Sequence, residues 1–367
     1  PMWFALDGET AEYEYSYNYQ NWYPSVEYET NNTLTNVGLY DLSPFSKFEI
    51  KSEKAYEDLQ RICTSNIKQE PGKCTYTHML NKDGGIETDL TVVCIKQNHF
   101  RIISSAATRE RDKFHIKKHL SEGVELIDVT DDYCVLGIFG PKSRLLMQEL
   151  SSDDFSNQNF RFANSKYIEI DGTEIWIQRL SYVGELGYEL YIKTSDSKNI
   201  YEKIIKKGKK YNLSNCGMHA LDTMRMESGF LHWGHDISPE ENQYQAGLNF
   251  TISYKKDFNF IGREALEKIK NKKIDIKFAM FVLKNNEPGK PLLLHDEPIY
   301  KDNKIVGRTT SGNYSFNFKK NLAFGYINNN FSDDELLNAS ISIEIEKIKY
   351  PAEIIFNPLK QTNFKNN

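Results

Sequence analysis

Cysteine is scarce in this sequence, and its spacing excludes the common cysteine-based sites. The five cysteines are Cys63, Cys74, Cys94, Cys134 and Cys216, and no two of them form a C-x-x-C pair. A zinc ribbon or a thioredoxin-type redox site needs such a pair. An odd number of loosely spaced cysteines favours free thiols in a reducing compartment. We therefore expect a cytoplasmic protein, or a protein of the mitochondrial matrix if the source is eukaryotic.

Long apolar runs and an excess of basic residues are also missing. No apolar run approaches the roughly 20 residues that a membrane-spanning helix needs. Lys and Arg number 46 against 51 Asp and Glu, and both signs are mixed along a chain with a net charge of −5. Proteins that bind nucleic acid typically carry a concentrated basic surface. We therefore expect no nucleic acid and no membrane as a partner.

Nucleotide fingerprints are incomplete. The segment Gly184–Gly187 has two glycines three residues apart, but a predicted strand follows it where a dinucleotide site needs a helix. The segment Gly137–Ser143 follows a strand and opens a helix, but it lacks the Gly-Lys-Ser/Thr of a phosphate loop. The sequence therefore predicts no flavin-binding or nucleotide-binding site of its own.

The length and the local patterns divide the chain into three ranges. A chain of 367 residues is too long for one ordinary hydrophobic core. Residues 1–38 are polar and aromatic with weak periodicity, and their alternating part predicts at most one strand. This range cannot bury itself, so we expect an arm or a linker. Residues 39–275 mix helical and strand patterns, and residues 276–367 are rich in short strands.

Periodicity places the elements of the middle range. Strands are expected within residues 42–50, 76–80, 86–95, 100–104, 134–139, 167–170, 174–180 and 188–192. Helices are expected at residues 52–62, with Ser52 as a possible N-cap, and at residues 108–120, 142–150, 197–207 and 219–231.

Beyond residue 275 the helical patterns stop. Short strands are expected at residues 278–283, 298–300, 305–307, 322–327 and 341–345, with Asp302-Asn303 as a hairpin turn. Repeated short strands joined by polar turns favour a small β-barrel. The predicted fold class is therefore α+β with a C-terminal β-barrel.

The segment Gly84-Gly85 to Val92 is the most informative one. Paired glycines allow a tight turn that most side chains would block. On the strand that follows, Glu87, Asp89 and Thr91 share one face, because side chains alternate. If that face lines a pocket, Asp89 is a carboxylate that can stabilise a cation or act as a general base. An ordinary solvent-facing aspartate on a half-buried strand fits the same pattern.

Two further segments carry candidate side chains. Glu189 alternates with Tyr188 on a predicted strand, and it is either a surface residue or a two-point acceptor for neighbouring N–H donors. His232 and His235 are three residues apart but have no obvious third ligand, so we expect no metal site. Arg225 lies just upstream on a predicted helix and bonds either within the structure or in a pocket.

Several segments resemble the aminomethyltransferase (glycine cleavage T-protein) family, and most of all the C-terminal folate part of dimethylglycine and sarcosine dehydrogenases. They run in family order over about residues 39–360. The matching strings are LYDLSPFSKFEI, YTHMLNKDGGIETDLTV, VLGIFGPKSRLLMQEL, SYVGELGYELYI, ALDTMRMESGFLHWGHDISPEENQYQAGL, FIGREAL and VGRTTSGNYSFNFKKNLAFGYI. Residues 1–38 are similar to the segment that joins a flavin domain to this part in those dehydrogenases.

This resemblance implies a three-lobed fold around a central tetrahydrofolate site. It implies that Asp89 is the catalytic aspartate, that Tyr76 packs beside the folate, and that Glu189 grips the pterin. Tyr188 and Arg225 lie in the matching strings and are expected as further folate contacts. One position departs from the T-proteins, which carry an Arg where this chain has Leu221. The departure puts the contacts to the folate tail in doubt and favours the dehydrogenase subgroup.

The implied activity is one-carbon transfer. In a whole dehydrogenase, an upstream FAD domain in cis oxidises an N-methyl amine to an iminium, and this part captures the methylene group as 5,10-methylenetetrahydrofolate. FAD is expected only in that upstream domain. A stand-alone aminomethyltransferase or demethylase with another methyl donor, and a non-catalytic folate-binding module, are the alternatives. The sequence does not identify the amine or the oligomeric state.

Overall fold

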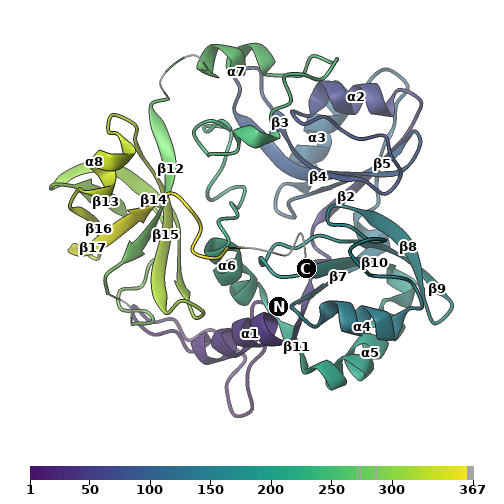
Figure 1. Cartoon of the computed structure of the whole chain (residues 1–367), viewed down its shortest axis with the longest axis horizontal. Coiled ribbons are helices and arrows are strands. Elements are labelled where there is room, and N and C mark those ends of the chain that lie inside the picture. Colours follow the sequence, from purple (N-terminus) through teal and green to yellow (C-terminus); the bar gives the residue numbers. More distant parts are fainter. Residues whose placement is uncertain (271, 273, 286, 362–367) are drawn as a thin grey trace.

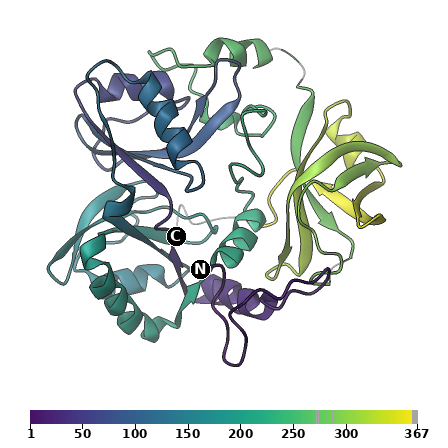
Figure 2. The same ribbon diagram turned by 180° about the vertical axis from the view of Figure 1, so that it is seen from behind.

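The chain folds into three lobes, two built on open sheets and one on a closed barrel (Figure 1). The computed structural model describes residues 1–361 except 271, 273 and 286. The same three lobes are seen from behind in Figure 2, with the barrel on the opposite side of the view. The predicted class, α+β with three lobes and a C-terminal barrel, is therefore confirmed. Within the expected range 276–367, residues 286 and 362–367 lie outside the described residues.

The first lobe is a five-stranded sheet with the strand order β3-β4-β5-β2-β6. Its strands are β2 (Ser46–Lys51), β3 (Cys74–Leu80), β4 (Ile86–Lys96), β5 (His99–Ser104) and β6 (Leu126–Asp128). Helices α2 (Ala55–Ile62) and α3 (Arg109–His119) cover one face of this sheet. The candidate site lies on the opposite face of β3 and β4.

The second lobe is a six-stranded sheet with the strand order β11-β1-β7-β10-β9-β8. Its strands are β1 (Val37–Asp41), β7 (Tyr133–Phe139), β8 (Ser165–Ile170), β9 (Thr173–Gln178), β10 (Gly187–Lys193) and β11 (Leu213–Cys216). Helices α4 (Ser143–Leu150) and α5 (Ser197–Gly208) pack on one face and bury its core. Helices α1 (Tyr23–Thr35) and α6 (Met218–Glu227) lie on the other side of this lobe.

The third lobe is a closed barrel with the strand order β12-β15-β14-β13-β16-β17. Its strands are β12 (Ile276–Leu283), β13 (Pro298–Lys301), β14 (Lys304–Ser315), β15 (Lys320–Asn328), β16 (Ile341–Ile345) and β17 (Ile348–Ile355). Asp302 and Asn303 connect β13 and β14 and have φ angles of +48° and +67°. Left-handed backbone at both positions suits a tight hairpin, so that prediction is confirmed.

The structure corrects several sequence-based boundaries. Residues 13–22 form no strand, and α1 begins at Tyr23. The helix expected from residue 52 begins at Ala55, and the Ser52 hydroxyl instead accepts from the amide of Lys54 at 3.2 Å in the turn before the helix. Three α-helices of the described residues were not predicted: α1 (Tyr23–Thr35), α7 (Arg263–Lys270) and, inside the barrel region, α8 (Asp333–Leu337).

The chain after the barrel returns to the second lobe. In Figure 1 this yellow segment runs from the barrel towards α6. The amide of Lys360 donates to the carbonyl of Glu227 at 2.9 Å, and its ammonium lies 2.6 Å from Glu185. The segment that follows the barrel is therefore fastened to α6 and to the second lobe. Among the described residues, no helix has the length and apolar character that crossing a membrane requires.

Candidate functional site

The paired glycines set the start of the strand that carries Asp89. Gly84 has a φ of +90°, which side chains rarely adopt. A Cβ on Gly85 would lie 1.9 Å from the carbonyl oxygen of Pro239. The side-chain oxygen of Asn81 accepts hydrogen bonds from the amides of Asp83 and Gly85, both at 2.9 Å. The turn is therefore closed from inside by Asn81 and covered from outside by residue 239.

The strand alternates as the sequence predicted. Along β4, Thr88 and Leu90 are buried beneath the helices, whereas Asp89 and Thr91 keep part of their surface exposed. Asp89 lies opposite His78 in the register of β3 and β4, and Tyr76 lies opposite Thr91. The face that holds Asp89 therefore also holds Tyr76 and His78.

Asp89, Tyr76 and His78 form one hydrogen-bonded cluster. The Tyr76 hydroxyl lies 3.2 Å from Oδ2 of Asp89 and 3.3 Å from Nε2 of His78. Burial raises the pKa of Asp89 to about 6, and the nearby Asp112 acts in the same direction. Burial lowers the pKa of His78 to about 3, so the imidazole is neutral near pH 7. The Tyr76 ring nevertheless keeps 39% of its surface exposed.

Glu189 lies on β10 of the second lobe. It lies near Cys74, which begins a row of alternate β3 side chains formed by Cys74, Tyr76 and His78. Its Oε2 accepts a hydrogen bond from the Tyr191 hydroxyl at 3.1 Å. Burial raises the pKa of Glu189 to about 7. Burial raises the pKa of Cys74, and the charge of Glu189 acts in the same direction; Cys74 precedes Tyr76 by two residues on β3. Alternate residues on a strand are about 6.6 Å apart, so Glu189 and Asp89 face opposite ends of this row.

Tyr188 does not share the face of Glu189. Its side chain is completely buried in the core beneath α4 and α5. The ring centroid lies 5.7 Å from that of Phe155 and 5.9 Å from that of Phe160. Neighbouring residues on a strand point to opposite faces, so the structure argues against the direct folate contact expected for Tyr188.

Arg225 joins α6 to the barrel. Its Nε donates to Asp222 at 2.8 Å, and Nη1 donates to Asp236 at 2.5 Å. Its Nη2 donates to Ser311 on β14 at 2.8 Å, and its guanidinium lies over the Phe324 ring at 5.1 Å. The side chain is only 2% exposed. These contacts favour a structural role over the ligand contact expected for Arg225.

Tyr182 is a further candidate near the cluster that periodicity did not single out, although it lies in one of the matching strings. Its hydroxyl donates to the carbonyl of Leu231 at 2.7 Å, and its ring stacks on Phe230 at 5.8 Å. Burial raises its pKa, and the charges of Asp89 and Asp222 act in the same direction. Tyr182 therefore lies close enough to Asp89 and Tyr76 to interact with them electrostatically, and it is anchored to the segment after α6. Sequence periodicity could not find it, because it lies in an irregular segment between β9 and β10.

Leu221 and Asp222 lie where this chain departs from the T-protein sequence pattern. Leu221 is buried in a core cluster, with 4% of its surface exposed. The Asp222 carboxylate accepts hydrogen bonds from Arg225 and from the side-chain amide Nδ2 of Asn313, the latter at 2.9 Å. Its side chain is 37% exposed. Leu221 therefore presents no polar group where the T-proteins are expected to have an arginine.

His232 and His235 lie close together, with ring centroids 4.7 Å apart. Burial and the charge of Arg225 lower the pKa of His232. In the part of the chain that the structure describes, no three His, Cys, Asp or Glu side chains are grouped to hold a metal ion.

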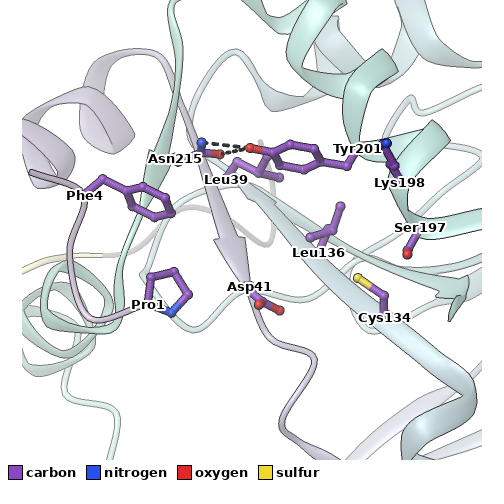
Figure 3. A pocket seen from close by; sticks show the side chains of 10 residues that line it. All are labelled: Pro1, Phe4, Leu39, Asp41, Cys134, Leu136, Ser197, Lys198, Tyr201 and Asn215. Atoms are coloured by element: carbon purple, nitrogen blue, oxygen red, sulfur yellow. Dashed lines mark hydrogen bonds between the residues drawn. The ribbon is translucent and has the colours of Figure 1, made fainter.

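A groove of about 310 Å³ lies elsewhere on the second lobe, between α5 and the strands β1, β7 and β11 (Figure 3). The Tyr201 hydroxyl and the Asn215 side chain bond across it. Its lining residues are Pro1, Phe4, Leu39, Asp41, Cys134, Leu136, Ser197, Lys198, Tyr201 and Asn215. None of the predicted site residues is among them.

Two family descriptions match the chain. The GCVT N-terminal domain matches residues 3–256, and the glycine cleavage T-protein C-terminal barrel domain matches residues 277–360. The crystal structure of glycine cleavage system aminomethyltransferase T from Bartonella henselae has the same fold, with a TM-score of 0.82 at 19% sequence identity. The match covers 97% of this chain and 96% of that chain.

Curated relatives are of two kinds. Mitochondrial dimethylglycine dehydrogenase of Rattus norvegicus is 33% identical over 365 residues, which are 99% of this chain but 42% of that protein. The aminomethyltransferase of Anoxybacillus flavithermus is 28% identical over 337 residues, 92% of this chain and 90% of that protein. The chain thus spans less than half of the dehydrogenase that it matches. It belongs to the glycine cleavage T-protein (aminomethyltransferase) family.

Proposed function

We propose that this chain binds tetrahydrofolate against the exposed face of β3 and β4 and supports one-carbon transfer at Asp89. The family is tetrahydrofolate-dependent. The observation that carries the proposal is the Asp89 carboxyl, which is fixed on a rigid strand and has a pKa raised to about 6 by burial. A carboxyl with a pKa close to neutral can both take and return a proton at physiological pH.

The residues present fit a reduced pterin. Glu189 offers a carboxylate in a buried setting, with one oxygen already oriented by Tyr191. Such a carboxylate is a two-point acceptor for the neighbouring N–H donors of an amino-pyrimidine edge. The Tyr76 ring is held through its hydroxyl but is 39% exposed, so it offers a flat surface for a ring. Asp89 and Glu189 lie towards opposite ends of this surface.

Each side chain has a defined task in this proposal. Tetrahydrofolate supplies the nucleophilic nitrogens that accept the one-carbon unit. Glu189 fixes the orientation of the pterin, and Tyr76 holds its plane. Asp89 stabilises positive charge when ionised and receives a proton from a reacting nitrogen at Oδ1 or Oδ2. Positioning the two reactants is the main source of rate expected for such a reaction.

For the one-carbon donor we propose the iminium of an oxidised N-methyl amine of the dimethylglycine or sarcosine type. The match of 99% of this chain to 42% of dimethylglycine dehydrogenase supports this donor. In this proposal an FAD domain in cis produces the iminium, and this chain captures the methylene group.

A stand-alone aminomethyltransferase is the second candidate. It is favoured by the match to the Anoxybacillus flavithermus aminomethyltransferase, which covers 90% of that protein. The coding sequence upstream of Pro1 discriminates between the two, because only the dehydrogenase needs a flavin domain there. A folate-binding module without activity would bind tetrahydrofolate and fail every transfer assay.

The test uses the 367-residue chain and two variants. Calorimetry with tetrahydrofolate should give saturable binding to wild type and to Asp89→Asn, with dissociation constants within about threefold. One-carbon transfer should fall by about 10²-fold or more in Asp89→Asn, the usual contribution of a general acid or base. Asp83→Asn, at an exposed position of the neighbouring turn, is the matched control. Unchanged transfer in Asp89→Asn would remove Asp89 from this role, and an absence of tetrahydrofolate binding would overturn the proposal.

A further inference from the structure

The cluster around Asp89 extends one residue beyond His78 and ends at Thr251. Nδ1 of His78 lies 3.0 Å from Oγ1 of Thr251. The Thr251 hydroxyl donates its own proton to the carbonyl of Leu248 at 2.7 Å. A hydroxyl has a single proton, so Oγ1 of Thr251 must accept from His78.

This contact fixes the tautomer of His78. The ring is completely buried and neutral, because burial lowers its pKa to about 3. With the proton on Nδ1, Nε2 carries a lone pair and can only accept a hydrogen bond. The group within reach of Nε2 is the Tyr76 hydroxyl, at 3.3 Å.

The Tyr76 hydroxyl thus has one proton and two acceptors. When Asp89 is ionised, the carboxylate is the stronger acceptor and takes the proton of Tyr76. Nε2 of His78 then has no donor from Tyr76. When Asp89 is protonated, its own O–H donates to the Tyr76 oxygen, and the Tyr76 hydroxyl turns to Nε2. The protonated state therefore makes one hydrogen bond more than the ionised state.

We propose that His78, held as its Nδ1–H tautomer by Thr251, is a positioning residue that acts through the Tyr76 hydroxyl to stabilise the protonated form of Asp89. No proton passes along the chain of groups. A reacting nitrogen gives its proton to the Asp89 carboxylate, and the Tyr76 hydroxyl rotates from Asp89 to His78. The reverse rotation accompanies the return of that proton. The consequence for catalysis rests on the proposed function of Asp89.

Other groups that influence Asp89 come from neighbouring elements. Asp112 on α3 raises its pKa through its negative charge. Tyr182, from the segment between β9 and β10, lies near enough for its own pKa to be raised by Asp89. Neither Asp112 nor Tyr182 makes a recorded hydrogen bond to His78 or Thr251. Their effect on the pKa of Asp89 should therefore be the same in wild type and in variants of the hydrogen-bonded chain Thr251–His78–Tyr76, which we call the relay. The backbone at Thr251 is itself held, because Ser65 donates to its carbonyl at 2.8 Å.

The test is a titration of Asp89 in the folate-free chain. Protein labelled with ¹³C at the aspartate carboxyls is titrated by NMR, and the Asp89 signal is identified by its loss in Asp89→Asn. His78→Asn keeps a donor near Thr251 but has no atom that reaches Tyr76. A hydrogen bond is worth about 0.5–1.5 kcal/mol, so the Asp89 midpoint should fall by roughly half to one pH unit. His295→Asn, at an exposed histidine in the barrel, should leave it unchanged.

Two further comparisons test whether His78 acts on Asp89 through the Tyr76 hydroxyl and whether Thr251 is needed. In a Tyr76→Phe background, His78→Asn should produce no additional shift of the midpoint, because the connecting hydroxyl is gone. Thr251→Val should lower the midpoint as His78→Asn does, whereas Thr251→Ser, which keeps the acceptor, should match wild type. The valine variant also serves if His78→Asn fails to fold.

The inference is overturned if His78→Asn and Thr251→Val leave the midpoint in place, or if His78→Asn shifts it equally without the Tyr76 hydroxyl. Its outcome is separate from that of the proposed function, since the titration needs no folate. Failure of the titration with tetrahydrofolate binding intact would remove the relay alone. Failure of binding with the titration as expected would remove the proposed function alone.

Discussion

Nη1 of Arg225 lies 2.5 Å from Oδ2 of Asp236, and their side chains are 2% and 0% exposed. This ion pair lies where α6 meets the barrel, because Asp236 also accepts hydrogen bonds from Thr310 and Ser311 of β14. A buried charge that loses its partner is strongly destabilising. The pair therefore fastens the barrel to the second lobe.

Arg225→Ala should lower the free energy of unfolding by about 3–5 kcal/mol, since Asp236 is left buried and unpaired. Urea denaturation measures this change. Arg308→Ala removes an exposed partner of Asp296, with side chains 58% and 57% exposed, and should cost less than about 1 kcal/mol. Equal losses in the two variants would show that the buried pair does not fasten the lobes.

Glu189 should make the stability depend on pH. Its pKa is raised by burial to about 7, whereas a glutamate in the unfolded chain has a pKa of about 4.3. Between these values the native state holds a proton that the unfolded state has lost, so the free energy of unfolding falls as pH rises. In Glu189→Gln this fall should be smaller, and the variant should be more stable than wild type at pH 8 but not at pH 4.

Urea midpoints at pH 4, 6 and 8 measure this difference. Glu174→Gln, at an exposed position on β9, is the matched control and should follow wild type at every pH. A Glu189→Gln profile parallel to that of wild type would contradict burial of the Glu189 carboxyl as the cause.

Glu29 should hold the first residues of the chain in place. Its Oε1 accepts from the amide of Phe4 at 2.6 Å, and its Oε2 accepts from the amide of Gly217 at 2.8 Å. Glu29→Ala removes both bonds, so limited proteolysis should cut within residues 1–20 faster than in wild type. Mass spectrometry of the products measures this. Glu27→Ala, on the exposed side of the same helix, should give the wild-type pattern, and equal cleavage in both variants would argue against the tether.

Gly85 should tolerate no side chain. Its Cβ would lie 1.9 Å from the carbonyl oxygen of Pro239, which is backbone and cannot rotate away. Gly85→Ala should therefore cost about 1–3 kcal/mol of unfolding free energy, the usual range for forced overpacking. Asp83→Ala, at an exposed position of the same turn, should stay within about 0.5 kcal/mol. A thermal-melt series decides, and a Gly85→Ala melt equal to that of Asp83→Ala would refute the contact.

The elements that sequence patterns predicted well are those whose buried face is apolar. The alternation along β4 placed Asp89 on the face opposite Thr88 and Leu90, and the structure agrees. Helix α1 was missed because the face that it buries is largely polar. That face carries Glu29, Thr30 and Thr33, which are all less than 2% exposed. A search for apolar periodicity cannot see such a helix.

The short helix α8 carries a helix-start signal in its sequence. Ser332 accepts from the amide of Glu335, and the Glu335 side chain accepts from the amide of Ser332. This capping box begins a helix of five residues within an otherwise all-β region. The local hydrogen bonds of this capping box determine that the segment is helical, although short strands surround it.

The sequence by itself determined the α+β class with a C-terminal barrel, the strand that carries Asp89 and the turn before it, because these follow from local periodicity and glycine geometry. The three-lobed arrangement was expected from the family resemblance alone. Only the tertiary structure decided which side chains meet. It joined Asp89 to His78 and Thr251, which is 162 residues beyond Asp89 in the sequence. It also placed the Tyr188 side chain in the core of the second lobe and paired Arg225 with Asp236 between α6 and the barrel. The physical reason is that burial, desolvation and hydrogen-bond partners come from packing within and between lobes, which no local pattern encodes.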